Sequence, residues 1–339
     1  MRLITSILCT LITVSIYAQQ TPIEYMQSIS GEFKKIQGAT WDYTKSVAKN
    51  KGARKVNKNR LELVNTIQAS LDQVNQAGAY DGKTYYRDSI KSFLEVNLAV
   101  VSEDYAKIMD LEDIAEQSYD MMDAYLTAKQ VASEKLRVAG EKVDRAEKQF
   151  AEENNIKLIQ TDDRVSLKLK KANKVYAYYN PIYLIFFKSY KQESYLMDAL
   201  NKGDIAAMEQ NKSSLSKFAS DGLEELNQIE AFDNDASLKQ ACVDMLKFYQ
   251  EEAEKDFNSL TEFYTNKEAF EKVKSKLDAK KGKNITQEEV DEYNKLVKEY
   301  NESTASFNET NQRLNNNRSK LINNWNNTAA KFTKKHATH

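Results

Sequence analysis

The chain has 339 residues and a formal net charge of −1, and 29% of its residues are charged while 41% are hydrophobic. Only two prolines and nine glycines occur in a chain rich in Lys, Glu, Ala and Leu, which is typical of long helices. The composition therefore predicts an all-α protein of one or two domains. Because the net charge is close to zero, the chain has no general attraction to nucleic acid, and we expect no such partner.

Residues 1–18 are predicted to be a secretory signal peptide. Arg2 precedes an apolar run, and Ala18 stands at the last position before the expected cleavage, where a small residue is needed. An uncleaved membrane anchor is the alternative, but the run is short and a helix start follows it at once. Lipidation of Cys9 fits less well, because the residue before it is not small. We therefore expect an exported protein that begins at Gln19, is not integral to the membrane, and lies in the periplasm, at the cell surface or outside the cell.

Helix start and stop signals divide the remaining chain into about seven helices, which form an N-terminal half (19–160) and a C-terminal half (161–339). Thr21 and Thr286 each precede a glutamate by three residues, the pattern of a capping box. A kink is expected near Asp110, and Asn180 followed by Pro181 predicts a restart or kink. The expected helices cover about residues 21–50, 53–77, 84–154, 162–201, 204–230 and 236–280, and a last helix runs from about 286 almost to the end of the chain. The sequence thus predicts an elongated antiparallel helical bundle.

The stretch Val175–Phe187 is the most apolar part of the chain after the N-terminal run. Apolar residues occupy more than one face of this predicted helix, which is typical of a helix surrounded by other helices. At about 13 residues the stretch is shorter than the roughly 20 that cross a bilayer. We therefore expect a central core helix. The alternative is a membrane-active protein, similar to pore-forming toxins, that hides this segment inside a soluble bundle.

The two halves of the chain resemble each other, which predicts an internal duplication. Asn50-Lys51-Gly52 is repeated as Asn201-Lys202-Gly203, and Ala79-Tyr80-Asp81 corresponds to Ala231-Phe232-Asp233. The helical positions that match are Leu71, Val74, Asn75, Gln76, Ile90, Phe93 and Leu94 with Leu223, Leu226, Asn227, Gln228, Cys242, Met245 and Leu246. Loop residues at matched spacing are the stronger evidence, because amphipathic helices align easily by chance.

Several segments resemble those of a known protein family. They are Glu103–Met109, Ala115–Asp120, Tyr183–Gln192, Asp291–Asn294 and Asn323–Trp325. By these segments the chain resembles a family of bacterial surface proteins of unknown function that is shared by Bacteroidota and spirochaetes. The resemblance implies an exported, all-helical protein, and it brings no catalytic residue with it.

Few side chains with catalytic chemistry remain in the expected mature chain. His336 and His339 are its two histidines, and both are expected in a frayed C-terminal tail. This argues against a histidine base and against zinc sites with histidine ligands. No glycine-rich phosphate loop is present. Cys242, the one cysteine left after cleavage, is expected to be a small buried residue. We therefore expect a non-enzymatic protein without a cofactor.

Asp113, Glu116, Asp120 and Asp123 are spaced to share one face of a helix. A solvated acidic face is the simpler interpretation, and a cation site is the alternative, although the histidine of di-metal bundle motifs is missing. A carboxylate pair of the glycosidase type is a further alternative, but no particular pair of residues indicates one.

The last predicted helix has a seam of two columns. One column recurs at every seventh residue and consists of Tyr293, Tyr300, Phe307, Leu314 and Leu321. The companion column is apolar at its ends and polar at Thr304, Asn311 and Arg318. These three residues either fix the register against a neighbouring helix or line a groove for a ligand or partner. Both interpretations predict a carboxylate within reach of Arg318, because an unpaired half-buried guanidinium is costly.

Two surface features complete the candidate sites. A cluster of cations surrounds the first interhelical turn and consists of Lys49, Lys51, Arg54, Lys55 and Lys58. It is either a solvated helix end or a patch for anionic glycans or lipid headgroups. Ser89, within Asp88-Ser89-Ile90, matches a bacterial O-glycosylation signal. The sequence predicts an exported, non-enzymatic helical protein that binds an envelope component or another protein.

Overall fold

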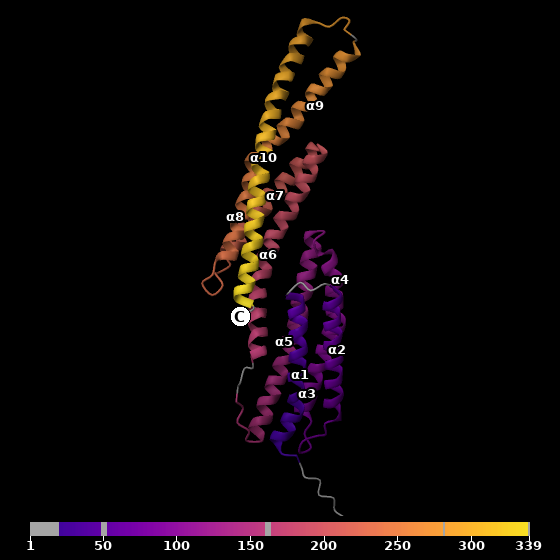
Figure 1. The fold of residues 1–339 in the computed structure, drawn as a ribbon, viewed down its shortest axis with the longest axis vertical. Helices are drawn as coiled ribbons and strands as arrows, with labels where there is room; N and C mark the ends of the chain where they lie inside the picture. Colours follow the sequence, from indigo (N-terminus) through magenta and orange to yellow (C-terminus); the bar gives the residue numbers. More distant parts are fainter. Residues whose placement is uncertain (1–19, 49–52, 160–163, 281, 338–339) are drawn as a thin grey trace, which may run out of the picture. The chain divides into compact units, whose positions relative to one another are not determined.

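The computed structural model describes residues 20–48, 53–159, 164–280 and 282–337 (Figure 1). The regular structure of these residues is helical, and the all-α prediction is confirmed because they contain no β-strand. The elements are α1 (Pro22–Ala48), α2 (Ala53–Gln76), α3 (Tyr85–Ala99), η1 (Val100–Asp104), α4 (Tyr105–Ala115), α5 (Tyr119–Glu153), α6 (Arg164–Lys202), α7 (Ile205–Asn227), α8 (Ser237–Glu251), η2 (Glu252–Asp256), α9 (Phe257–Ala279) and α10 (Gln287–Ala337). The segments η1 and η2 are π-helical and join their neighbours without a break.

The predicted helix starts are confirmed at three caps. The Thr21 hydroxyl accepts a hydrogen bond from the Glu24 backbone amide at 3.3 Å, and the Glu24 carboxylate accepts one from the Thr21 amide at 2.9 Å. Thr286 and Glu289 exchange the same two bonds at 3.3 and 3.0 Å. The Asp204 carboxylate accepts from the Ala207 amide at the start of α7. Each cap satisfies amides that have no partner within their own helix.

The structure differs from the sequence prediction at two expected helix breaks. The helix expected over 84–154 does not simply kink near Asp110 but ends at Ala115, and α5 begins at Tyr119. The physical reason is Ser118, whose hydroxyl accepts from the Met121 amide at 3.3 Å and so starts a new helix. Conversely, α6 continues through Pro181 without a restart, and Pro181 lies at an exposed position of the helix.

The described chain forms two compact units. Unit 1 comprises residues 1–105 and 132–161, and unit 2 comprises residues 106–131 and 162–339. The expected division near residue 160 therefore needs a correction for the segment 106–131, which belongs to unit 2. The reason is burial, because Ala115, Met122 and Leu126 of this segment are part of the same apolar core as α6 and α7.

In unit 1 the helices α1 and α2 run antiparallel. The Tyr25 hydroxyl at the start of α1 donates to the Gly78 carbonyl that follows α2, and Asn59 near the start of α2 donates to the Asp42 carbonyl late in α1. A core of buried residues from α1, α2, α3 and α5 joins these helices; it includes Ile29, Leu63, Ile67, Ile90, Leu94, Val143 and Phe150. Burial of this apolar surface provides the main stabilisation of the unit.

In unit 2 the prediction of a central core helix is confirmed for Val175–Phe187. Val175, Ile182, Phe186 and Phe187 of α6 are buried in one core with α7, α8 and α10. The Phe186 ring stacks on the Trp325 ring of α10 with centroids 4.3 Å apart.

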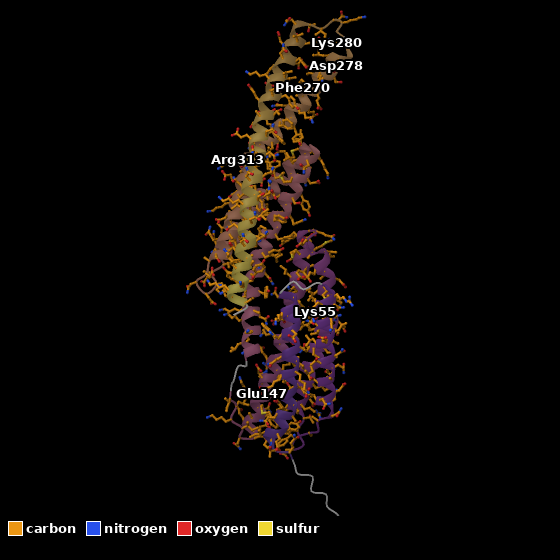
Figure 2. The ribbon with its side chains drawn as sticks, viewed as in Figure 1. Lys55, Glu147, Phe270, Asp278, Lys280 and Arg313 are labelled. Carbon is orange, nitrogen blue, oxygen red and sulfur yellow. The ribbon has the colours of Figure 1, made fainter. Side chains whose placement is uncertain are left out.

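Cys242 is also buried, as expected. Its thiol donates to the Ile182 carbonyl at 3.7 Å, and burial raises its pKa. Figure 2 shows the side chains along α9 and α10, among them Phe270 and Arg313.

The two units share local features at matched positions. Tyr80–Lys83 and Phe232–Asp235, which lie 152 positions apart (80 to 232, 83 to 235), form the two isolated β-bridges of the described residues. Each bridge precedes a helix of 15 residues, α3 or α8, and each of these helices runs into a π-helical segment of five residues. The duplication stays a prediction, and these features support it because π-helical segments are rare.

A trio of aromatic rings also recurs. In unit 1 the centroids of Tyr25, Tyr80 and Phe150 lie 5.2, 5.7 and 5.5 Å apart. In unit 2 those of Tyr178, Phe232 and Phe332 lie 5.2, 5.6 and 5.5 Å apart. Beside each trio an ion pair joins the bridge loop to the last helix of the unit. The loop residue is the cation in unit 1 and the anion in unit 2. Lys83 contacts Glu153 at 2.8 Å, and Asp235 contacts Lys335 at 2.7 Å.

Candidate functional site

Arg318 of α10 lies between two buried carboxylates of unit 2. Its Nε donates to Glu193 of α6, its Nη2 donates to Glu252 of η2 at 2.5 Å, and its Nη1 donates to the Asn315 side chain at 2.6 Å. The Glu193 and Glu252 side chains are 4% and 0% exposed. The structure thus places two carboxylates where the sequence predicted one. Glu193 gave a signal as the single polar gap in an apolar helix face, whereas Glu252 gave none.

The three charges of this cluster do not balance if both acids ionise. Burial, and the neighbouring charge of Glu193, raise the pKa of Glu252 to about 8 against the opposing effect of Arg318. Burial also raises the pKa of Glu193, which Arg318 opposes. At neutral pH we therefore expect Glu252 to hold a proton, so that one carboxylate faces one guanidinium. The contacts of Arg318 with α6 and η2 are those that the register interpretation requires of a residue in the seam.

The other two seam residues do not share this cluster. Thr304 and Asn311 are half-buried, so the predicted phase of the seam agrees with the structure. The Thr304 hydroxyl donates to the Tyr300 carbonyl at 2.6 Å, and the Asn311 side chain accepts from Asn315 at 3.3 Å. These bonds stay within α10. The expectation that the three polar residues act together is therefore corrected, since successive ones lie about 10 Å apart along the helix and only Arg318 binds other helices.

The predicted cationic patch is described in part. Lys49 and Lys51 lie outside the described residues, whereas Arg54 and Lys55 are exposed at the start of α2. Figure 2 labels Lys55. Lys58 pairs with Glu62 at 3.5 Å between two largely exposed side chains, and such pairs contribute little stability. The patch is thus consistent with a solvated helix end, and binding of anions there stays a prediction.

Ser89 lies within α3, between exposed Asp88 and buried Ile90, and is itself half-buried. A glycosyltransferase must reach the hydroxyl that it modifies. To modify Ser89, the enzyme would have to reach one side of α3, a helix that is packed against its neighbours. Glycosylation of Ser89 stays a prediction.

The predicted acidic face needs a correction. Asp113 belongs to α4 and Asp120 and Asp123 to α5, while Glu116 lies in the turn between the two helices. The four residues therefore do not share one helix face, because Ser118 starts a new helix. The described residues contain no group of three or more potential metal ligands.

His336 is not in a frayed tail, which corrects the prediction. It lies in the last turn of α10, is 8% exposed, and contacts the rings of Phe332 and Phe232 with centroids 4.7 and 5.0 Å away. Its Nε2 lies 2.9 Å from the Asp235 carboxylate. Hydrogen bonds from Lys335, Ser237 and His336 lower the pKa of Asp235. The cluster fixes the end of α10 on the loop before α8. His339 lies outside the described residues.

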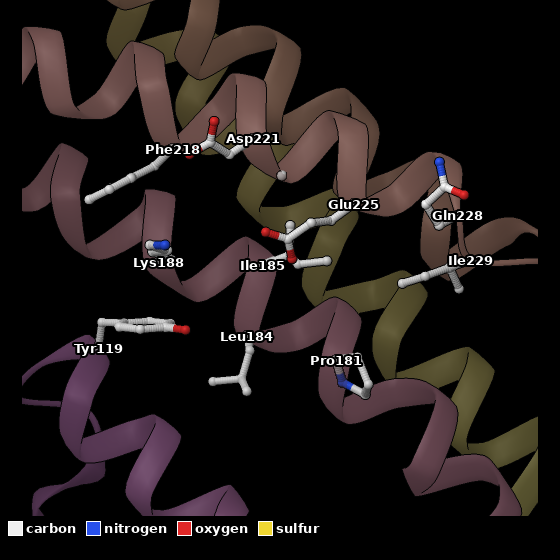
Figure 3. A pocket seen from close by; sticks show the side chains of 11 residues that line it. Tyr119, Pro181, Leu184, Ile185, Lys188, Phe218, Asp221, Glu225, Gln228 and Ile229 are labelled. Carbon is white, nitrogen blue, oxygen red and sulfur yellow. The ribbon is translucent and has the colours of Figure 1, made fainter.

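One feature of unit 2 that could hold a ligand is a cleft of about 410 Å³ between α6 and α7 (Figure 3). It is lined by Tyr119, Pro181, Leu184, Ile185, Lys188, Phe218, Asp221, Gly222, Glu225, Gln228 and Ile229. Its walls are mainly apolar, and a few charged side chains lie along it. Ligand sites in proteins commonly have this size and composition.

Lys188 occupies one end of the cleft between two aromatic rings. Its Nζ lies 4.5 Å from the centroid of Phe218 on α7 and 5.3 Å from that of Tyr119 on α5 (Figure 3). Asp221 pairs with Lys217 at 2.9 Å, whereas in the described part of the chain no ion pair engages the Glu225 carboxylate. Burial, and the charges of Asp123, Glu225 and Asp120, raise the pKa of Tyr119. This end of the cleft therefore combines aromatic walls with a negative environment.

Gly222 allows α7 to approach α6 and α8 closely beside the cleft. A Cβ atom at this position would lie 2.8 Å from Ile185 Cγ2 and 2.9 Å from Leu246 Cδ1. Side-chain atoms do not approach each other so closely without a shift of the packing. The absence of a side chain at Gly222 thus fixes the separation of the helices that form the cleft.

Unit 1 has a corresponding cleft of about 450 Å³ on α1 and α2, lined by Glu32, Lys35, Asn65, Thr66, Ala69, Ser70 and Gln73. Five of these residues lie 152 positions before cleft residues of unit 2. Glu32, Thr66, Ala69, Ser70 and Gln73 correspond to Leu184, Phe218, Asp221, Gly222 and Glu225. The unit 1 cleft has no aromatic wall, and Glu32 pairs with Lys35 at 2.8 Å. Neither cleft was predicted from the sequence.

In comparisons with known proteins, no protein family, curated protein or solved structure matches this chain. The geometry of its own side chains therefore carries the functional argument.

Proposed function

We propose that the protein is an exported, non-enzymatic binding protein that holds an envelope component or another protein in the cleft of unit 2. The observation that carries this proposal is the combination of Leu184, Phe218 and Ile229 as apolar walls with Lys188 and Glu225 as charged groups in one concave site. Apolar walls provide affinity for a ligand, and a few polar groups fix its orientation.

Export is proposed from residues 1–18, whose order of charged, apolar and small residues is that of a signal peptide. These residues lie outside the described part of the chain. The periplasm, the cell surface and the medium are all compatible with such a signal. N-terminal mass spectrometry of protein from the native host tests the proposal: a mature chain that begins at Gln19 supports it, and an intact Met1 contradicts it.

The membrane-active alternative rests on the apolar segment 175–187. Ile182, Phe186 and Phe187 of this segment are packed in the core of unit 2, so its release would require unfolding of that core. No helix in the described ranges is both long and apolar enough to cross a membrane. A liposome leakage assay separates the two functions, since only the membrane-active protein releases a trapped dye.

Capture from envelope extracts tests the binding proposal in vitro. Phe218→Asp places a charge on the apolar wall of the cleft, and Thr66→Asp makes the same change at the corresponding position of unit 1. We expect Phe218→Asp to bind the captured component at least tenfold more weakly, which corresponds to about 1.4 kcal/mol of binding free energy. Thr66→Asp should bind it as the parent does. Equal capture by both variants, when their melting temperatures match the parent, would reject the cleft as the binding site.

A further inference from the structure

The chemistry of the cleft indicates which kind of ligand it takes, and this step rests on the proposed function. At the aromatic end, the Lys188 ammonium is already held between the rings of Tyr119 and Phe218, at 5.3 and 4.5 Å from their centroids. The faces of aromatic rings attract cations, and ammonium ligands are commonly recognised by aromatic cages. The lysine thus shows that an ammonium group fits between these two rings.

The surroundings of the cage are acidic. Glu225 lines the cleft and has no ion-pair partner among the described residues, and Asp120 and Asp123 stand near Tyr119 on the first turns of α5. Lys188 is therefore one cation among several carboxylates. A second positive group is electrostatically favoured at this end of the cleft, whereas an anionic ligand would meet like charges.

We propose that the cleft of unit 2 recognises an organic ammonium group, which takes the place of the Lys188 ammonium between Tyr119 and Phe218. Lys188 then acts as an internal competitor. Its flexible four-carbon stem allows the ammonium to leave the cage for solvent when a ligand enters. The apolar side chains Leu184 and Ile185 line the adjoining part of the cleft, where they contact the carbon skeleton of the ligand.

The corresponding cleft of unit 1 provides a natural control. Thr66 stands where unit 2 has Phe218, and Gln73 stands where it has Glu225. The unit 1 cleft therefore lacks both an aromatic wall and the unpaired carboxylate. An ammonium ligand is expected to bind unit 2 and not unit 1, although the two clefts are similar in volume.

The test uses choline as the probe and 3,3-dimethyl-1-butanol, which has the same shape without the charge, as the comparison. Each is titrated into the full-length mature protein at constant ionic strength and followed by NMR chemical shifts. We expect choline to bind in the millimolar range, and Lys188→Met to bind it about tenfold more tightly because the competitor is gone. Phe218→Leu and Glu225→Gln, made in the Lys188→Met background, are each expected to weaken choline binding several-fold, whereas Thr66→Val leaves it unchanged.

Three results would overturn the proposal. They are equal affinity of Lys188→Met for choline and its neutral counterpart, unchanged choline binding after Phe218→Leu, and no binding of choline by either parent or Lys188→Met in the millimolar range. Flotation with phosphatidylethanolamine vesicles tests whether the ammonium group belongs to a lipid headgroup. If it does, the protein floats with the vesicles, and if the ligand is a free ammonium compound, the protein does not. If an envelope component is captured through the cleft while choline fails to bind, the ammonium inference fails and the proposed function stands.

Discussion

At the scale of single residues, Arg318 and its two carboxylates form a buried cluster of charged groups. Glu252 and Glu193 are almost completely buried, and the Glu252 Oε2 atom has no hydrogen-bond partner among the described residues. Because the pKa of Glu252 is raised to about 8, its proton is held more tightly in the folded than in the unfolded chain. Stability then falls as pH rises from the unfolded pKa, near 4.5, to the folded pKa, and stays low above it.

Glu252→Gln should remove this pH dependence, because the amide cannot ionise. We expect the variant to gain stability relative to the parent as the pH rises from about 5 to 9, by on the order of 1–3 kcal/mol. Urea unfolding at several pH values measures the difference. A constant difference between parent and variant over this range would show that Glu252 does not hold a proton in the folded protein.

Arg318→Leu should be strongly destabilising, because it leaves Glu193 and Glu252 buried without a positive charge. The expected loss is about 3–5 kcal/mol in the free energy of unfolding. Arg313→Leu is the matched control on α10. It breaks a more exposed pair with Asp256 of η2 and should cost about 1 kcal/mol or less.

At the scale of elements, helix ends were predicted where a cap has a local pattern. Thr21-Glu24 and Thr286-Glu289 are such patterns, and both caps form. Ser118 was missed because a single serine inside a long amphipathic run gives a weak signal. The π-helical segments were not predicted either. The Arg60 guanidinium of α2 donates to the Val101 and Ser102 carbonyls of η1, so a distant side chain contributes to that geometry.

Gly222→Ala should destabilise the helix contacts beside the cleft. In an exposed helix this change stabilises by up to about 1 kcal/mol, but here the new methyl group would lie under 3 Å from Ile185 and Leu246. We expect a net loss of about 1–3 kcal/mol, measured by urea unfolding. Gly31→Ala in α1, where no atom lies within 4 Å of the added carbon, is the control and should be neutral or stabilising. Equal effects at both positions would contradict the close packing at Gly222.

Phe186→Asp tests the role of α6 as the core helix of unit 2. Phe186 is buried against Trp325, so the substitution leaves an unpaired charge and a cavity in the core. A loss of about 4 kcal/mol or more is expected. Tyr195→Asp, at an exposed position of the same helix, should change stability by about 1 kcal/mol or less. Similar melting temperatures for the parent and Phe186→Asp would show that the segment is not part of a stable core.

At the scale of the whole molecule, the sequence predicted the helical class, most helix bounds and the central helix, because these follow from composition and from local periodicity. The clefts could not be predicted, since each depends on how closely two helices approach. Gly222 and Phe218 are unremarkable in a sequence and become informative only when α6 and α7 are placed together. The matched loops, π-helical segments and aromatic trios of the two units support the predicted duplication, and the two clefts differ in that one is aromatic and acidic while the other is polar.

Photo-crosslinking in living cells of the native host tests directly whether the cleft of unit 2 holds an envelope component. A photoreactive phenylalanine analogue is placed at Phe218 in the cleft of unit 2, and in a second strain at Thr66, its counterpart in unit 1. If unit 2 holds an envelope component, a discrete crosslinked species should form from position 218, should be absent from position 66, and should disappear when Glu225→Gln and Ile229→Asp are added. Identical crosslinking from both positions, or none from position 218 at normal protein levels, would contradict the account.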